Sequence, residues 1–197
     1  MRVIAGKYRS RRLRSLAGLD LRPTSDRLRE TLFDVLSAGQ PTALEGSLWI
    51  DLYAGTGAVG IEALSRGAGM VYFVESSRQG AALIRRNLQS LGLESGFEVL
   101  EKNSERALAE LEARAAQADF VFLDPPYRMQ AECRALLSAI AGSRLLNPNP
   151  TVIAEHARKF DPGAVFGALA RYRKLEQGGS TLSFYRKIEA SHPRFAG

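Results

Sequence analysis

Short apolar runs alternate with stretches of helical periodicity through most of this chain. The apolar runs predict five strands, at Leu48–Leu52, Val71–Glu75, Phe97–Glu101, Phe120–Asp124 and Thr151–Glu155. The stretches between them predict four helices, at about 58–67, 78–91, 104–116 and 129–141. Strands that are apolar on both faces and separated by helices form parallel sheets covered on both sides. The pattern therefore predicts an α/β fold of the Rossmann-like kind.

The two ends of the chain depart from this alternation. Ala170–Glu176 and Thr181–Lys187 flank Gln177-Gly-Gly-Ser180 and predict an antiparallel hairpin. At the start, residues 1–10 alternate around a glycine and predict a short hairpin or arm, and a helix is expected from Pro23 to about Ala38. A mostly parallel sheet closed by a C-terminal hairpin is not the usual layout of a dinucleotide-dependent dehydrogenase.

The 197 residues are enough for one domain with a small extension. We expect a basic arm and helix in residues 1–40, the main domain in 41–190 and a tail in 191–197. No apolar run is long enough to span a membrane and no signal peptide is visible, so we expect a cytoplasmic protein that does not bind membranes. The single cysteine, Cys133, falls on the apolar side of a predicted helix and is expected in the core. With His156 and His192 the only histidines, metal catalysis is unsupported.

The net charge of +6 is concentrated at the N-terminus. The first thirty residues hold nine of the 27 basic residues and three of the 21 acidic ones, so the rest of the chain is neutral. Clustered arginine suits a polyanion, because its planar fork binds phosphate at two points. A solvated basic tail is the alternative reading. The arginines expected to contact RNA are Arg9, Arg11, Arg12, Arg14, Arg27 and Arg29.

A glycine-rich loop follows the first strand of the main domain. Gly55, Gly57 and Gly60 form G-x-G-x-x-G between a predicted strand and a predicted helix, the setting in which this motif binds nucleotides. Glycine lets the backbone approach a ligand, and the helix start presents free N–H groups.

Acidic residues beside this loop indicate which nucleotide cofactor it binds. Asp51 would repel a pyrophosphate but suits the cationic amino-acid moiety of S-adenosyl-L-methionine. Glu75, at the end of the second strand, is placed to accept hydrogen bonds from the ribose hydroxyls of S-adenosyl-L-methionine or of a dinucleotide such as NAD, so it does not discriminate between them. Asn103 and Ser104 follow the third strand, where adenine would lie. The predicted cofactor is therefore S-adenosyl-L-methionine, and the expected contacts are Asp51, Tyr53, Gly55, Gly57, Glu75, Asn103 and Ser104.

The fourth strand ends in Asp124-Pro125-Pro126-Tyr127, at the edge of the sheet where ligands bind. The Asp124 carboxylate and the Pro125 carbonyl can accept hydrogen bonds from an amino group and direct its lone pair at a methyl carbon. Pro125 and Pro126 stiffen the loop, and Tyr127 offers a surface on which a flipped or unpaired base can stack. The alternative is a purely structural role, in which the Pro-Pro turn only caps the strand.

These motifs resemble a known family. Asp-Leu-Tyr-Ala-Gly-Thr-Gly (51–57) with Asp-Pro-Pro-Tyr (124–127) is similar to the amino-methyltransferases of the class I fold. Arg-Val-Ile-Ala-Gly-Lys-Tyr-Arg (2–9), the blocks at 21–33 and 60–68, and Leu-Ser-Phe-Tyr-Arg-Lys (182–187) resemble the bacterial RsmD-type enzymes. One departure is Asn103, where such enzymes often carry an acid toward adenine, although an amide can still bond to adenine's edge.

The resemblance implies a methyltransferase acting on the exocyclic N2 amino group of one guanine in 16S ribosomal RNA. The expected partner is that RNA in an assembled or assembling small subunit, and we expect a monomer. Two alternatives stay open: an adenine-N6 methyltransferase of DNA or RNA, because the tetrapeptide suits both amines, and a non-catalytic RNA-binding module with a relict fold. The chain has no sizeable target-recognition domain of the kind that DNA enzymes carry, and intact Asp124 and Tyr127 weigh against the relict.

Overall fold

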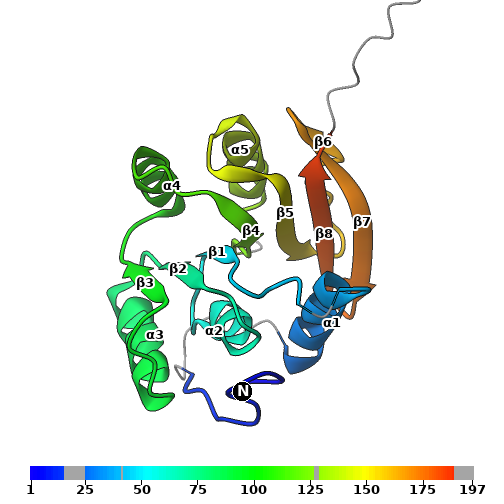
Figure 1. Ribbon diagram of the computed structural model, residues 1–197. Coiled ribbons are helices and arrows are strands. Elements are labelled where there is room, and N and C mark those ends of the chain that lie inside the picture. Colours follow the sequence, from blue (N-terminus) through cyan, green and yellow to red (C-terminus); the bar gives the residue numbers. More distant parts are fainter. Residues whose placement is uncertain (16–24, 41, 127–128, 189–197) are drawn as a thin grey trace, which may run out of the picture.

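A computed structural model describes residues 1–15, 25–40, 42–126 and 129–188. Within these residues, eight strands form one sheet in the order β3-β2-β1-β4-β5-β8-β7-β6 (Figure 1). The strands are β1 Leu48–Leu52, β2 Met70–Val74, β3 Phe97–Leu100, β4 Ala118–Leu123, β5 Leu146–Ala157, β6 Val165–Phe166, β7 Leu169–Gln177 and β8 Ser180–Lys187. The helices are α1 Asp26–Ser37, α2 Ala58–Ser65, α3 Arg78–Ser90, α4 Ser104–Ala113 and α5 Gln130–Gly142.

The architecture expected from the hydrophobic pattern is confirmed. Strands β1 to β5 pair in parallel, and β5, β8, β7 and β6 pair antiparallel at the C-terminal edge. Strand β5 begins earlier than expected, because Leu146 pairs with Ala118 before a register shift in β4. The two-residue strand β6 was not expected, since so short a segment has no periodicity to read.

Helices cover both faces of the sheet, with α1, α2 and α3 on one side and α4 and α5 on the other (Figure 1). Trp49 of β1 lies at the centre of the first layer, where its ring stacks 5.4 Å from Phe33 of α1 and 5.2 Å from Phe120 of β4. Such stacking contributes about 0.5–1.5 kcal/mol per pair beyond the area buried, so α1 is fixed to the sheet. Cys133 is buried in the second layer, as expected.

The basic arm lies against α2 and does not extend into solvent. Val3 and Leu13 are buried in the same core as Trp49, and Arg2 and Arg12 form an antiparallel bridge. The arm's backbone is held by side chains of α2: the Glu62 carboxylate accepts N–H bonds from Ile4 and Ala5. The first fifteen residues are therefore an integral part of the main core. No helix in the described ranges has the length and apolarity needed to cross a membrane.

Gly6 makes the closest approach between the arm and α2, and its replacement tests this docking. Its φ of +77° is unfavourable for other residues, and a Cβ there would lie 1.8 Å from the Ser65 carbonyl oxygen. We predict that Gly6→Ala lowers the free energy of unfolding by about 3 kcal/mol or more, measured by denaturant titration. The control is Gly39→Ala, with a φ of +80° and nothing within 4 Å of the added Cβ, which should cost only about 1–2 kcal/mol. Equal losses in the two variants would contradict the docked arm.

Candidate active site

The direction of the strand order reverses between β1 and β4, the place where open α/β sheets form a ligand-binding crevice. From β1 the chain proceeds to β2 and β3 on one side, whereas β4 and β5 lie on the other. In open α/β sheets, ligands bind at such a switch point, outside the carboxyl ends of the strands. The glycine loop follows β1 and the tetrapeptide follows β4, and the Asp124 N–H donates to the Leu52 carbonyl at 3.4 Å. The fold thus brings together two motifs that are about 70 residues apart in the sequence.

The loop after β1 has the backbone shape expected of a ligand-binding glycine loop. Gly55 and Gly57 have positive φ values of 55° and 78°, and Gly57 begins α2 without a side-chain cap. Tyr53 also has a positive φ, of 63°. A non-glycine residue in this region stores strain of order 1–3 kcal/mol and is typical of functional loops.

Asp51 lies at the end of β1 and is buried against the glycine loop. Its side chain is only 1% exposed, and its Oδ2 accepts the Gly60 N–H at 2.9 Å. Burial raises the pKa of this carboxyl to about 7; the Gly60 hydrogen bond opposes the increase and the nearby Glu75 charge adds to it. The expectation that Asp51 faces the cofactor's amino-acid moiety stays a prediction. The carboxyl lies beneath the glycine loop because α2 packs over β1, and it joins the end of β1 to the first turn of α2.

Glu75 is held at the other side of the same loop. Its Oε2 accepts the Gly55 N–H at 2.9 Å and its Oε1 accepts the Ser77 N–H at 2.8 Å. Sequence reasoning missed Gly80, where an added Cβ would lie 2.7 Å from the Glu75 Cγ. A glycine inside a predicted helix was the available signal, because it costs about 1 kcal/mol and usually has a packing reason.

Tyr53 connects three of the segments around the crevice. Its hydroxyl donates to Glu132 Oε1 in the first turn of α5, the helix that follows the tetrapeptide. Burial and the Glu132 carboxylate raise the pKa of Tyr53, and a hydrogen bond with Ser104 at the start of α4 opposes this. The expected residues Tyr53 and Ser104 are therefore brought together. Glu132 was missed, although an acid in the first turn of the helix after the tetrapeptide was a visible signal.

Asn103 caps α4 and is exposed. Its Oδ1 accepts the Arg106 N–H at 3.0 Å, which satisfies one of the free donors at the helix start. The residue follows β3 with Ser104, at the carboxyl edge where adenine was expected. While its oxygen caps the helix, its NH2 group is a separate hydrogen-bond donor.

The tetrapeptide continues directly from β4. Asp124 is half-buried, Pro125 is buried and Pro126 is exposed, and the Pro126 carbonyl accepts the Met129 N–H at 2.7 Å. Side chains alternate along β4, and Phe120 and Phe122 face the α1–α3 layer. Asp124 accordingly lies on the same face as Asp51, above the crevice. Tyr127 lies outside the described residues.

Five of the six arginines expected to contact RNA are exposed. Arg9, Arg11, Arg12 and Arg14 are on the docked arm and Arg27 is on α1. Arg29 is the exception, because its side chain is 0% exposed. Its guanidinium donates to Asp26 at 3.0 Å and to the Arg2 carbonyl, and lies 3.9 Å from Glu62. The prediction of an RNA contact for Arg29 is wrong, because the arm covers that face of α1.

Comparison with known proteins identifies the family of this chain. The profile of the family described as "Conserved hypothetical protein 95" matches residues 1–186. The chain belongs to this family. The chain is also similar along nearly its whole length to "Putative rRNA methyltransferase YlbH" of Bacillus subtilis, which is 34% identical over 95% of this chain and 99% of that protein.

Further relatives come from other bacteria. "Ribosomal RNA small subunit methyltransferase D" of Haemophilus influenzae is 36% identical, with 79% of this chain and 78% of that protein covered. The crystal structure described as that of "putative methylase HI0767" from the same organism has a TM-score of 0.76 at 31% identity and covers 96% and 99% of the two chains. An RNA methyltransferase of Salinibacter ruber, solved with S-adenosyl-L-homocysteine, is only 17% identical and shares the fold, with a TM-score of 0.63 and coverage of 87% and 97%.

Asp51 gives this family member an unusual pH dependence of stability. An acid whose pKa rises from 3.8 to about 7 on folding opposes folding when it ionises. Below about pH 4 the carboxyl is protonated in both states, and the stability that goes with the protonated form is fully present. As the pH rises to 7, this stability is lost, and the free energy of unfolding falls by on the order of 4 kcal/mol.

Asp51→Asn tests this, because the amide oxygen can still accept the Gly60 N–H but cannot ionise. The free energy of unfolding, measured by denaturation from pH 4 to 8, should shift in favour of the variant relative to wild type as the pH rises. Asp34→Asn, on the exposed side of α1, should keep the wild-type profile. A wild-type–variant difference that is constant with pH would contradict the raised pKa.

Proposed function

We propose that this protein is an S-adenosyl-L-methionine-dependent methyltransferase that acts on the N2 amino group of a guanine in 16S ribosomal RNA. The observation that carries the proposal is the placement of Asp124-Pro125-Pro126 beside a glycine loop at the switch point of the sheet. The similarity to a ribosomal RNA small subunit methyltransferase over 79% of the chain supports the substrate.

The residues around the glycine loop fit this cofactor. Asp51 and Glu75 are both acids close to Gly55 and Gly60, so the loop disfavours a pyrophosphate and favours a cationic ligand without phosphate. Glu75 uses one lone pair on each oxygen for backbone N–H groups and retains capacity for the ribose hydroxyls. Tyr53, Gly55 and Gly57 would hold the amino-acid moiety, and Asn103 and Ser104 the adenine.

When bound, the cofactor supplies an electrophilic methyl group: the base nitrogen bonds to it, the carbon–sulfur bond breaks, and the nitrogen releases one proton to solvent. The residues of this chain position the nitrogen. The Asp124 carboxylate and the Pro125 carbonyl accept hydrogen bonds from the two N–H groups of the amino group. This leaves the nitrogen lone pair directed at the methyl group. Pro126 and Pro125 carry no N–H that would compete for these acceptors. The role proposed for Tyr127 is stacking on the base.

The exposed arginines of the arm provide the RNA-docking surface in this proposal. Arg9, Arg11, Arg12 and Arg14 lie on a backbone that is fixed to α2, so their positions relative to the crevice are set by the fold. Their expected partners are phosphates of the ribosomal RNA, either in an assembled or in an assembling small subunit.

The substrate assignment is tested by offering labelled S-adenosyl-L-methionine to unmethylated small subunits, naked 16S RNA and DNA in parallel. Mass spectrometry of the digested products should find N2-methylguanosine in the ribosomal samples and no label in DNA. N6-methyladenine, or transfer to DNA alone, would overturn the proposal. Binding of NAD without binding of S-adenosyl-L-methionine, measured by calorimetry, would overturn the cofactor.

Asp124→Ala tests the catalytic assignment. We expect a loss of kcat on the order of 100-fold or more, because the amino group loses its positioning acceptor. Calorimetry should find an unchanged affinity for the cofactor. Tyr127→Phe should retain most activity and Tyr127→Ala should not, since stacking requires the ring alone; equal losses would exclude the stacking role.

The arm is tested by replacing Arg9, Arg11, Arg12 and Arg14 with alanine and measuring RNA binding at several salt concentrations. Each phosphate contact contributes roughly 0.7–0.9 to the slope of log K against log salt, so the slope should fall by roughly 3. The matching four-lysine variant should keep most of the slope, and both should retain cofactor affinity. An unchanged slope in a folded alanine variant would place the RNA elsewhere.

A further inference from the structure

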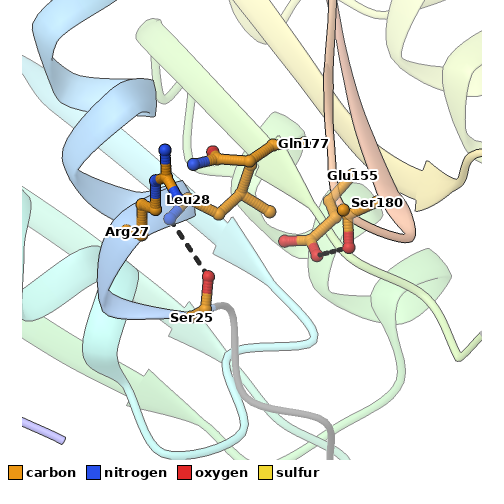
Figure 2. A pocket seen from close by; sticks show the side chains of 7 residues that line it. Ser25, Arg27, Leu28, Glu155, Gln177 and Ser180 are labelled. Carbon is orange, nitrogen blue, oxygen red and sulfur yellow. Dashed lines mark hydrogen bonds between the residues drawn. The ribbon is translucent and has the colours of Figure 1, made fainter.

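A cavity of about 230 Å³ lies between the start of α1 and the β7–β8 hairpin (Figure 2). None of the residues lining it belongs to the cofactor loop or the tetrapeptide. Its polar wall comes from the sheet and the hairpin, and α1 forms the opposite wall. The lining includes Ser25, Arg27, Leu28, Glu155, Gln177 and Ser180.

The register of the sheet places this cavity beside Asp124. Leu123 of β4 pairs in parallel with Ala154 of β5, so Asp124 and Glu155 are the next residues on neighbouring strands. Neighbouring strands are about 4.8 Å apart, and paired residues face the same side of a parallel sheet. Ile153, two residues before Glu155, faces the α1–α3 layer, as Phe122 does. Glu155 therefore follows Asp124 along one face, on the side away from the glycine loop.

Hydrogen-bond acceptors line the inner wall of the cavity. Glu155 is 4% exposed, and its Oε1 accepts the Ser180 hydroxyl at 3.1 Å. The Ser180 hydroxyl helps to orient this carboxylate, and a carboxylate has about four acceptor positions in all. Gln177 Oε1 is buried and accepts no hydrogen bond within the described part of the chain. The burial of that oxygen keeps it from the cavity, so the acceptor that a ligand can meet on this wall is the Glu155 carboxylate, which favours a ligand edge that carries N–H groups.

We propose that the cavity receives the target base and that Glu155 selects guanine by accepting its N1–H. This rests on the proposed function, because Asp124 and Pro125 take the neighbouring N2 amino group. Guanine has N1–H adjacent to that amino group, whereas N1 of adenine is an acceptor and would face a carboxylate with no proton between them. The tetrapeptide suits both amines, and Glu155 supplies the discrimination that it lacks.

Arg27 completes the site at its rim. Its exposed side chain rises from α1, and Figure 2 shows Gln177 extending from the hairpin toward it. A cation at the mouth of a cavity whose wall is rich in acceptors matches a nucleotide, whose base enters while its phosphate stays outside. Arg27 is thus the one exposed arginine assigned to the target nucleotide itself, separate from the arm.

The experiment uses 2-aminopurine, which keeps the amino group that accepts the methyl but has no N1–H. After the methylated guanine has been mapped, 16S RNA is ligated with either guanine or 2-aminopurine at that position, and methyl transfer to each is measured. Wild type should prefer guanine by at least about tenfold. Glu155→Gln should reduce this preference to within about threefold, because an amide N–H can donate to the N1 of 2-aminopurine.

The ratio of the two rates within one protein preparation does not depend on how much of the variant is folded. Glu176→Gln is the control: Glu176 is on the β7–β8 hairpin that borders the cavity but does not line it, and it pairs with Arg158 and Lys174, so this variant should keep the wild-type ratio. Equal rates on the two bases in wild type, or an unchanged preference in Glu155→Gln, would overturn the role of Glu155. Failure of wild type to methylate any guanine would instead overturn the proposed function.

Discussion

The buried carboxylate of Glu62 holds the arm, α1 and α2 together. It accepts the backbone N–H groups of Ile4 and Ala5, pairs with Arg66 at 2.8 Å and lies 3.9 Å from Arg29. An unpaired charge in this position would cost several kcal/mol, so separating any of these partners is unfavourable. If the arm left, the Glu62 carboxylate would lose two hydrogen-bond donors, which is unfavourable. The exposed arginines and the α1 wall of the cavity therefore keep fixed positions relative to the sheet.

Three acids follow one face of the sheet at its carboxyl edge. Asp51 is on β1, Asp124 follows β4 and Glu155 is on β5, so they run from the glycine loop toward the α1 cavity. Their environments separate their roles. Asp51 lies beneath the loop with a pKa of about 7, Asp124 borders the crevice, and Glu155 is held by Ser180. Three carboxyl groups on one face of the sheet thus stand in three different environments.

Local patterns predicted the elements well, and most of their differences from the structure occur at ends. Strand β1 matches its expected bounds, whereas β5 extends back to Leu146 because pairing with Ala118 lies beyond the apolar run that marks the strand. The motif residues that depend on local backbone, such as Gly55 and Gly57, have the expected conformations. Arg29 could not be assigned in this way, since its charge suggested a surface contact while its burial depends on the distant arm.

The amino-acid sequence alone specifies the strands, the helices, the glycine loop and the tetrapeptide, because periodicity, turn chemistry and motif spacing are local properties. It also places the positive charge in the first thirty residues. Long-range contacts decide the rest: Asp51 is buried because α2 packs over β1, and Glu132 meets Tyr53 across 79 residues. Glu155 stands beside Asp124 only because β4 and β5 pair in register. No local pattern carries these relations, since they depend on which strands become neighbours when the chain folds.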